Sequence, residues 1–439
     1  MSAIIEEEPY AAAVVGEQLK YVCSHCFSRN EGKPLKRCSH CKVIAYCSGD
    51  CQKKDWILHK VECTSLVSVS PRIPTAMARL LGRLIIRKSR GDNINVKSFN
   101  DRTFEDLMHH SEDIQSDPER LHFFTCIAHV LKEYLPSEIM LEPVELMRYF
   151  GRVVINCFSI VGNDEIAVGE GIYLGLSALN HSCAPDAFVR FHGRTALLRS
   201  PSSGVTYSNK LTIPYTALDT LNCERGKALE RQYYFKCKCT VCQDKERDGY
   251  ALSIKCTACT DGVCLVSPSY TVLTCTKCAT VSDASIDDMI RMNQEVEWFL
   301  EREKGVEDND ITVSLTSATN LYKKYSNIFS RFNLPFANLA YRIVNLALSI
   351  DRRDIALQYA YSYLDAYKRY IPMGHPLLTA CLLTAGIAAS YQDPPNGKIL
   401  QLLEEARSSC LLSHGPRDPE SVNVDRQVAL YRTRLQNIS

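Results

Sequence analysis

The residues best suited to chemistry are the cysteines, of which the sequence contains 21. A first group combines seven cysteines with one histidine: Cys23, Cys26, Cys38, Cys41, Cys47, Cys51, His59 and Cys63. Eight such ligands are the number that two tetrahedral zinc ions need. Paired Cys-x2-Cys elements joined by short loops cannot build a hydrophobic core of their own. We therefore expect metal binding to supply the folding energy of residues 23–63.

Two further cysteine groups follow. The segment "YYFKCKCTVC" carries Cys237, Cys239 and Cys242, one ligand short of a structural zinc site. Two Cys-x2-Cys pairs then fit the spacing of a zinc ribbon, with a metal-free loop as the alternative: Cys256, Cys259, Cys275 and Cys278. Cys264 lies between these two pairs and is not needed as a ligand. Five single cysteines stand in apolar surroundings, and we expect them in the core: Cys126, Cys157, Cys223, Cys381 and Cys410.

The stretch "ALNHSCAPDA", residues 178–187, offers a fourth ligand for the second group. A short apolar run ends in four polar residues, Asn180 to Cys183, and a proline follows. One interpretation is a strand that leaves the core and turns at Pro185. The other is that the polar residues build a site, in which Cys183 supplies the missing ligand. A free buried thiol is the alternative for Cys183.

The periodicity of the chain predicts an α+β protein. Residues 1–20 read as the end of a strand, and residues 66–150 carry helical periodicity. Short apolar runs with glycines and turn residues indicate strands around 165–215. From residue 285 to 439, successive amphipathic helices suggest stacked antiparallel pairs, similar to a tetratricopeptide array. The expected units are therefore 1–20, 23–63, 66–150, 151–220, 221–245, 250–283 and 285–439.

Composition limits the classes of function. The 439 residues carry a net charge of +1, which argues against a general binder of polyanions. The N-terminus lacks the features of a signal peptide, and no stretch is apolar for the ~18 residues that a membrane span needs. We therefore expect an intracellular monomer that does not enter a membrane. The segment 23–63 is locally basic and reads either as a solvated face or as a peptide- or nucleic-acid-binding surface: Lys33, Lys36, Arg37, Lys42, Lys53, Lys54 and Lys60.

The order of these features resembles the SET- and MYND-domain (SMYD) family of protein-lysine methyltransferases. Its most specific parts are the ligands of residues 23–63 with the tail "YCSGDCQKKDWILHKVEC", and the series "NHSC", "PY" and "YYFKCKC". The resemblance covers nearly the whole chain and implies a small β-rich SET domain, split by a MYND finger and a helical insert and followed by a post-SET zinc site.

The resemblance also implies how the ligands are shared. One zinc ion would take Cys23, Cys26, Cys47 and Cys51; a second would take Cys38, Cys41, His59 and Cys63. A third would take Cys183, Cys237, Cys239 and Cys242. With the ribbon, we expect four zinc ions per chain.

The activity that the resemblance implies is methyl transfer from S-adenosylmethionine to a lysine of a histone or another protein. Such an enzyme must align the amine with the methyl group, exclude water and accept a neutral lysine, whose reference pKa is ~10.4. An aromatic channel favours the neutral amine by desolvation and tolerates the methylated cation. The resemblance assigns four residues to this channel: Tyr215, Tyr233, Phe158 and Ser177. It assigns four residues to the cofactor: Asn180, His181, Tyr215 and Phe235. Gly169 and Gly171 would allow a tight turn before the strand of Tyr173.

The sequence also departs from the family pattern. It begins at "MSAIIEEEPYA", which resembles the second strand of the split SET domain, so we expect the cofactor contacts of the preceding Gly-rich turn to be lost. "APDA" replaces the usual Asp-Pro-Asn, and Pro214 would remove a backbone donor from the strand before Tyr215. The alternative function is a zinc-dependent adaptor that binds proline-rich peptides through MYND and other proteins through its C-terminal helices. The family implies a location in cytoplasm and nucleus.

Overall fold

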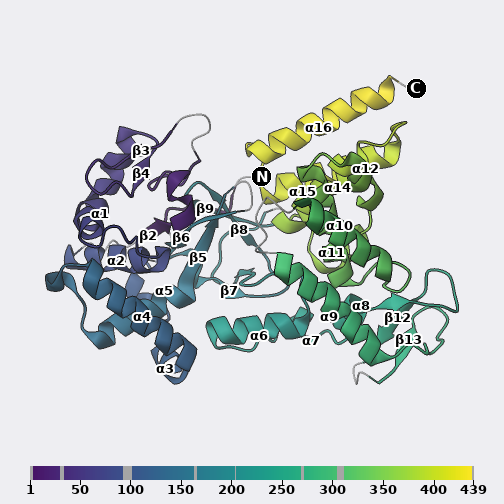
Figure 1. Cartoon of the computed structure of the whole chain (residues 1–439), viewed down its shortest axis with the longest axis horizontal. Coiled ribbons are helices and arrows are strands. Elements are labelled where there is room, and N and C mark those ends of the chain that lie inside the picture. Colours follow the sequence, from purple (N-terminus) through teal and green to yellow (C-terminus); the bar gives the residue numbers. More distant parts are fainter. Residues whose placement is uncertain are drawn as a thin grey trace.

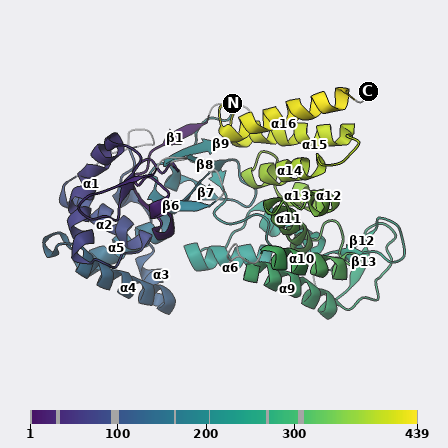
Figure 2. The ribbon, with the colours of Figure 1, turned by 45° about the horizontal axis from the view of Figure 1, so that its top comes forward.

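The computed structural model describes residues 3–29, 34–91, 101–162, 166–202, 204–267, 271–303 and 311–437. The fold is mixed α+β, as predicted, with a helical C-terminal region (Figure 1). Helices α1 to α5 lie at the left of the view, the C-terminal helices lie at the right, and short strands lie between them. Helix α6 (Asn222–Tyr233) crosses below the strands between the two groups, and the rotated view in Figure 2 shows the same arrangement.

The N-terminal strands pair with strands that come much later in the sequence. One antiparallel sheet has the order β1-β9-β8, and a second has the order β2-β6-β5. The strands of these sheets are β1 (Ile5–Glu7), β2 (Ala11–Val14), β5 (Cys157–Val161), β6 (Ala167–Ile172), β8 (Phe188–His192) and β9 (Thr195–Arg199). Because β2 pairs Ala11 with Ile172, everything between β2 and β5 is an insertion into one sheet.

In the residues that the structure describes, that insertion contains a small cysteine-rich unit and five α-helices. Strands β3 (Lys36–Arg37) and β4 (Ala45–Tyr46) form a two-stranded ribbon. The helices are α1 (Gly49–Ser68), α2 (Ala76–Ser89), α3 (Ser111–Ser116), α4 (Pro118–Tyr134) and α5 (Pro143–Asn156). Helix α2 packs on β2 and β6, so it covers one face of the second sheet. The length of α1 was not predicted, because its charged residues hide the apolar face that Leu58 and Leu66 bury.

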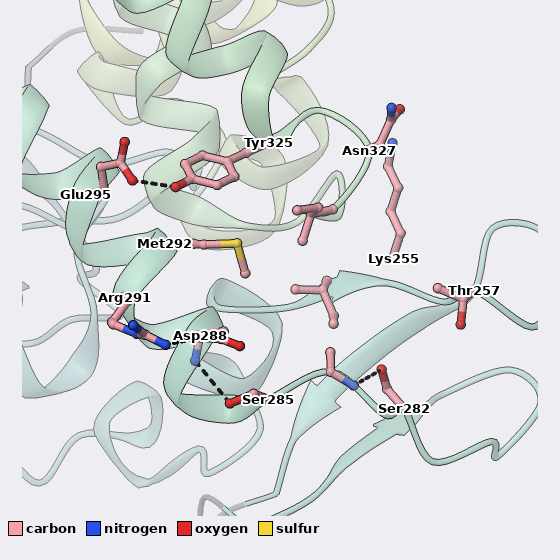
Figure 3. Close-up of a pocket in the computed structure, with 13 residues that line it drawn as sticks. Lys255, Thr257, Ser282, Ser285, Asp288, Arg291, Met292, Glu295, Tyr325 and Asn327 are labelled. Atoms are coloured by element: carbon pink, nitrogen blue, oxygen red, sulfur yellow. Dashed lines mark hydrogen bonds and ion pairs between the residues drawn. The ribbon is translucent and has the colours of Figure 1, made fainter.

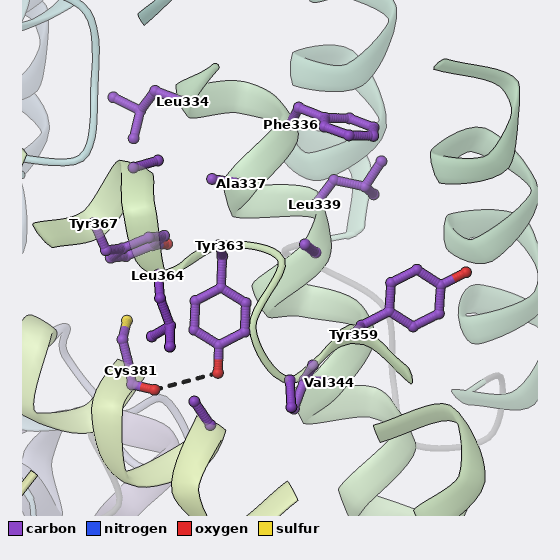
Figure 4. Close-up of a cluster of buried hydrophobic side chains, with 14 of the residues drawn as sticks. Leu334, Phe336, Ala337, Leu339, Val344, Tyr359, Tyr363, Leu364, Tyr367 and Cys381 are labelled. Atoms are coloured by element: carbon purple, nitrogen blue, oxygen red, sulfur yellow. Dashed lines mark hydrogen bonds between the residues drawn. The ribbon is translucent and has the colours of Figure 1, made fainter. Parts of the chain in front are cut away.

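The C-terminal helices form the largest hydrophobic cluster of the described residues, part of which is shown in Figure 4. They are α9 (Ile286–Glu303), α10 (Ile311–Tyr325), α11 (Leu334–Ser349), α12 (Arg353–Tyr359), α13 (Leu364–Tyr370), α14 (Pro376–Ala389), α15 (Gly397–Ser413) and α16 (Pro419–Gln436). Helix α15 packs between α14 and α16, and α11 contacts α9, α10 and α12. Within the described ranges, every helix is too short or too polar to cross a membrane.

One C-terminal helix that the periodicity predicts is divided in two. Residues 356–370 form the end of α12 and all of α13, with turns between them. The aromatic side chains on either side of the break have different partners. Tyr359 packs edge-on against Tyr322, and the hydroxyl of Tyr363 donates to the carbonyl of Cys381 (Figure 4). The two helices therefore pack against different neighbours.

The remaining strands are short. Strands β7 (Asn180–His181) and β10 (Thr212–Ile213) are parallel partners, and β11 (Ile254–Lys255), β12 (Val263–Val266) and β13 (Leu273–Cys275) form a third antiparallel sheet. Residues 176–178 form a 3-10 turn, so the apolar run before Asn180 is not a strand, and β7 consists only of the polar residues Asn180 and His181. Helices α7 (Thr240–Gln243) and α8 (Arg247–Ala251) connect α6 to this sheet.

Two expectations from the sequence are wrong. Cys126 and Cys223 were expected in the core, but both thiols are on exposed helix faces, whereas Cys381 and Cys410 are buried. Gly169 and Gly171 lie inside β6 rather than in a turn. A Cβ at Gly169 would lie 2.2 Å from the ring of Phe27, so Gly169 is required by the close approach of the cysteine-rich unit.

Candidate active site and metal centres

The structure brings the sixteen predicted metal ligands together in four clusters, each with ligand atoms within 4.8 Å of one another. We name each cluster by its first residue. The Cys23 cluster contains Cys23, Cys26, Cys47 and Cys51, and the Cys38 cluster contains Cys38, Cys41, His59 and Cys63. The Cys183 cluster contains Cys183, Cys237, Cys239 and Cys242, and the Cys256 cluster contains Cys256, Cys259, Cys275 and Cys278. The grouping is the one that the family resemblance implies, and the role of each residue as a ligand stays a prediction.

The distances between these atoms fit a shared zinc ion. Two thiolates at about 2.3 Å from one tetrahedral zinc lie about 3.8 Å apart, whereas a disulfide joins sulfurs at about 2.05 Å. The Sγ atoms of Cys38 and Cys63 are 3.6 Å apart, and those of Cys183 and Cys242 are 3.5 Å apart. Sγ of Cys41 lies 3.7 Å from Nε2 of His59. The cysteines are all free thiols, so the spacing is not that of oxidised pairs.

The Cys256 cluster has two further features of a metal-binding knuckle. The backbone amides of Ala258 and Lys277 donate to the sulfurs of Cys256 and Cys275, each at 3.3 Å. Such amide donors stabilise thiolates rather than neutral thiols. A Cβ at Gly262 would lie 2.4 Å from Sγ of Cys259 and 2.7 Å from Sγ of Cys275, so the sulfurs converge where only glycine fits.

A buried ion network joins the cysteine-rich unit to the second sheet. Arg83 of α2 donates to Asp55 and Glu62 of α1, with its shortest bond 2.6 Å from Nη2 to Oε2 of Glu62, and it also donates to the carbonyl of Ala12 in β2. Glu62 in turn contacts Nδ1 of His59 at 3.2 Å and so orients this ligand. Burial would raise the pKa of Glu62, but the charge of Arg83 outweighs burial and holds the pKa well below its usual range.

Four rings from three segments form an aromatic cluster beside the Cys183 cluster. Tyr215 lies 4.9 Å from Tyr233 and 5.3 Å from His181, measured between ring centroids. Phe235 lies 6.0 Å from His181 and 6.3 Å from Tyr233. Tyr234 ends α6 with a φ of 59°, and this left-handed turn places Tyr233 and Phe235 on the same side of the chain.

Hydrogen bonds to Leu179 and His181 fix the position of Tyr215. Its amide donates to Nδ1 of His181 at 3.0 Å, and its hydroxyl donates to the carbonyl of Leu179. Pro214 follows the two-residue strand β10, so the expected loss of a strand donor does not occur. Ser182 instead donates its amide to the carbonyl of Ile213.

Burial keeps the groups of this cluster neutral. It raises the pKa of the Tyr215 phenol to about 12, with Tyr233 adding to the effect, and it also raises the pKa of Tyr233. Burial and the nearby Arg225 charge lower the pKa of His181 to about 4. At neutral pH the cluster therefore presents two phenols and a neutral imidazole. This apolar setting disfavours a charged amine and favours its neutral form.

Comparison with known proteins identifies the finger and the relatives of the chain. Residues 23–63 match the MYND finger family model. The chain is 33% identical over 253 residues to human histone-lysine N-methyltransferase SMYD3, a match that spans 57% of this chain and 58% of the relative. It is 26% identical to histone-lysine N-methyltransferase ASHR1 of Arabidopsis thaliana, over 87% of this chain and 81% of the relative. Rat N-lysine methyltransferase SMYD2 is 24% identical, over 95% of this chain and 90% of the relative. The chain is thus similar to SMYD proteins over most of its length.

The match to the first of these SMYD relatives covers less than two thirds of its length.

Two other predicted channel residues lie outside the aromatic contacts described above. The ring of Phe158 packs edge-on against Tyr173 at 5.7 Å, and the hydroxyl of Ser177 donates to the carbonyl of Tyr173 at 2.6 Å. The side chain of Asn180 is exposed on β7, one residue before His181. The roles assigned to these residues stay predictions.

Sequence reasoning missed two carboxylates that hold the candidate site together. Asp186 receives the amide and the hydroxyl of Thr212, at 3.0 and 2.7 Å, so the "APDA" variant still ties the segment after Cys183 to β10. Glu7 is 3% exposed, and its two oxygens accept the amides of Gly175 and Leu176 at 2.8 and 2.9 Å. This bond pair anchors the turn that carries Ser177. The acidic run "EEE" reads as surface, and no spacing distinguishes Glu7 within it.

A hollow of about 700 Å³ lies elsewhere in the protein, between β11 and the first turns of α9 (Figure 3). Met292 lies near its middle, while the Arg291–Asp288 and Tyr325–Glu295 pairs lie along its sides. None of the residues predicted for catalysis or cofactor binding lines this hollow.

Proposed function

We propose that the protein is an S-adenosylmethionine-dependent protein-lysine N-methyltransferase that acts on histone or other proteins. The observation that carries the proposal is the aromatic cluster of Tyr215, Tyr233 and Phe235 around His181, held by the segment "NHSC". The names of the relatives, which are lysine methyltransferases, support it. The sheets with β7 and β10 would be the SET domain, the Cys183 cluster its post-SET site, and the C-terminal helices a tetratricopeptide-like domain.

The residues present fit the cofactor. An exposed amide, Asn180, stands beside half-buried aromatic rings, which suits a ligand with a polar amino-acid part and a flat base. When bound, S-adenosylmethionine supplies an activated methyl group on a sulfonium. Asn180 and His181 would bind its polar parts, and Phe235 would pack against its base. These contacts orient the ligand, and the half-buried rings exclude water.

The lysine would enter between Tyr215 and Tyr233. The phenols are neutral, so the amine loses its proton to water before it enters, because the buried surroundings penalise an ammonium. The Tyr215 hydroxyl is already fixed on the carbonyl of Leu179, so its oxygen can accept a hydrogen bond in a set position. Phe158 and Ser177 would complete the channel.

Methylation of peptides and histones with labelled S-adenosylmethionine tests this function. We expect wild-type protein to methylate lysine and Tyr215→Phe to lose about 100-fold in rate, the size of effect that a positioned polar group has in a transition state. Tyr361→Phe is the matched control, because Tyr361 is 47% exposed on the helical domain. Methylation that survives Tyr215→Phe would contradict the proposed mechanism. A wild-type chain that shows no calorimetric heat with millimolar cofactor would contradict the activity.

We further propose that the MYND finger binds a proline-rich peptide, with a weak contact to nucleic acid through the same basic face. Its basic side chains are exposed on one unit: Lys36, Arg37, Lys42, Lys53, Lys54 and Lys60. Lys33 lies outside the described residues. Two acidic residues of the finger, Asp55 and Glu62, turn inward to Arg83 and do not offset this charge. Trp56 is 43% exposed beside them and offers an apolar contact. We propose a monomer that acts in cytoplasm and nucleus.

A further inference from the structure

Arg225 of α6 is among the most deeply buried charged residues of the protein, with 1% of its surface exposed. Its Nε donates to Sγ of Cys183 at 3.4 Å. The two other guanidinium nitrogens donate to the carbonyl of Thr220 and to Oδ1 of Asn222. Each of the three guanidinium nitrogens thus has an acceptor, and one of these acceptors is a predicted zinc ligand.

Arg225 forms no ion pair with a carboxylate in the part of the chain that the structure describes. A buried guanidinium without a negative partner is strongly unfavourable, so its charge must be balanced by another group. Four thiolates and one Zn²⁺ carry a net charge of −2, and Cys183 presents part of that charge to Nε. The Cys183 cluster is therefore the counter-ion that Arg225 otherwise lacks.

The same sulfur is linked to the aromatic cluster. Nε2 of His181 lies 3.3 Å from Sγ of Cys183, and Nδ1 of His181 accepts the amide of Tyr215 at 3.0 Å. Because Nδ1 is an acceptor, the proton of the neutral ring is on Nε2 and donates to the thiolate. Arg225 and His181 thus hold Cys183 from two sides, and His181 passes the constraint to the backbone of Tyr215.

We propose that Arg225 is a positioning residue: it neutralises the thiolate of Cys183 and, through the Cys183 cluster and His181, fixes the place of Tyr215. Groups that contact metal ligands from outside commonly change metal affinity by about 10–100-fold. The part of the proposal that concerns zinc is independent of the proposed methyltransferase function. The part that concerns Tyr215 as a catalytic group rests on that function.

Arg247 provides a matched control. It is also buried, with 7% of its surface exposed, and it donates to the carbonyls of Thr220 and Leu218 at 3.1 and 2.9 Å. It is paired with Asp248, whereas Arg225 is paired with the thiolate. Arg247→Met therefore removes a buried guanidinium from the same region without removing a donor to the cluster.

The test uses the full chain reconstituted with ¹¹³Cd, whose NMR shift reports hydrogen bonds to the coordinating sulfurs. The resonance of the Cys183 cluster is assigned by its loss in Cys242→Ser. We expect Arg225→Met to shift this resonance and to leave those of the other clusters in place. A zinc-loaded sample treated with a chromogenic chelator should release one metal ion about 10-fold faster than wild type. Hydrogen exchange of the peptide with Tyr215 should also speed up. Arg247→Met removes no donor to the cluster sulfurs and should change each of these readouts less than Arg225→Met does.

The proposal is overturned if Arg225→Met leaves the assigned resonance and the release rate unchanged, or if Arg247→Met reproduces both effects. Should Arg225→Met fail to fold, Arg225→Gln, which also removes the charge but remains polar, carries the same expectations. Methylation is measured in parallel on the zinc-loaded variants. Wild-type protein without methylation would refute the proposed function, while the cadmium shift would still decide the role of Arg225.

Discussion

Replacing Arg83 with methionine should separate the MYND finger from the sheet that it packs against. Arg83 is 4% exposed, and it is the shared partner of the carboxylates of Asp55 and Glu62, which are 5% and 0% exposed. Methionine fills much of the same volume but leaves both carboxylates buried without a cation. Removing one partner from a buried ion pair costs about 3–5 kcal/mol, and the two carboxylates place the expected loss at the upper end.

Thermal unfolding of the zinc-loaded chain measures this loss. One kcal/mol corresponds to about 2–4 °C for a unit of 150–250 residues, so the N-terminal lobe should melt at least about 10 °C earlier. Lys88→Met on the same helix is the control, because its pair with Glu145 is on the surface and contributes at most about 1 kcal/mol. Adding Asp55→Asn to the Arg83 variant should restore part of the stability, since it removes one unpaired charge. An Arg83→Met protein with full zinc occupancy that melts within about 2 °C of wild type would refute the reasoning.

Three further predictions concern pH, a buried carboxylate and zinc. Burial lowers the pKa of His375 from 6.5 to about 4, so the free energy of unfolding should fall as pH drops from 6.5 toward 4, by up to about 1.4 kcal/mol per pH unit. Urea titrations at several pH values should show a smaller dependence of this free energy on pH for His375→Asn than for wild type. An unchanged pH dependence in the variant would contradict the prediction. Glu7→Gln places an amide donor against the backbone amides of Gly175 and Leu176, and it should lower the free energy of unfolding by about 1–3 kcal/mol in chemical denaturation. The substitution Glu8→Gln, at an exposed residue, should not lower it. Equal effects of the two substitutions would contradict the role of Glu7 in holding this turn. Chelation should remove the helical circular dichroism of α1 before that of the C-terminal helices, because the finger depends on metal; an unchanged spectrum after complete zinc loss would disprove this.

The parts that sequence predicted well are those set by short spacing. A Cys-x2-Cys pair places two thiols on one side of a turn whatever the rest of the chain does, so the MYND ligands could be recognised from residues 23–63 alone. The helices after residue 285 were predicted because their apolar faces repeat over several turns. The tetratricopeptide-like arrangement and the unit boundaries depend on contacts between helices, which one sequence does not contain, and they stay predictions.

The parts that sequence missed are charged residues whose environment is made by distant segments. Arg83, Arg225 and Glu7 look like surface residues, because most arginines and glutamates are exposed. Their burial follows from partners that lie far away in the chain: β2 for Arg83, the residues after β7 for Arg225, and the turn at 175–176 for Glu7. Cys126 and Cys223 show the opposite error, because both were expected in the core and both are exposed.

The insertion between β2 and β5 sets an order for synthesis on the ribosome. Strand β2 leaves the ribosome early, but its partner β6 follows only after more than 150 residues, since Ala11 pairs with Ile172. Cys63 is the last ligand of the finger, which needs only local contacts and metal, so the finger can fold before β2 has a strand partner. An unpaired strand can pair with other chains and aggregate. The sequence Ala11-Ala12-Ala13-Val14 lessens this risk, because alanine is small and a weak strand former. Zinc supply during translation would then decide whether that unpaired edge lies beside a folded or an unfolded finger.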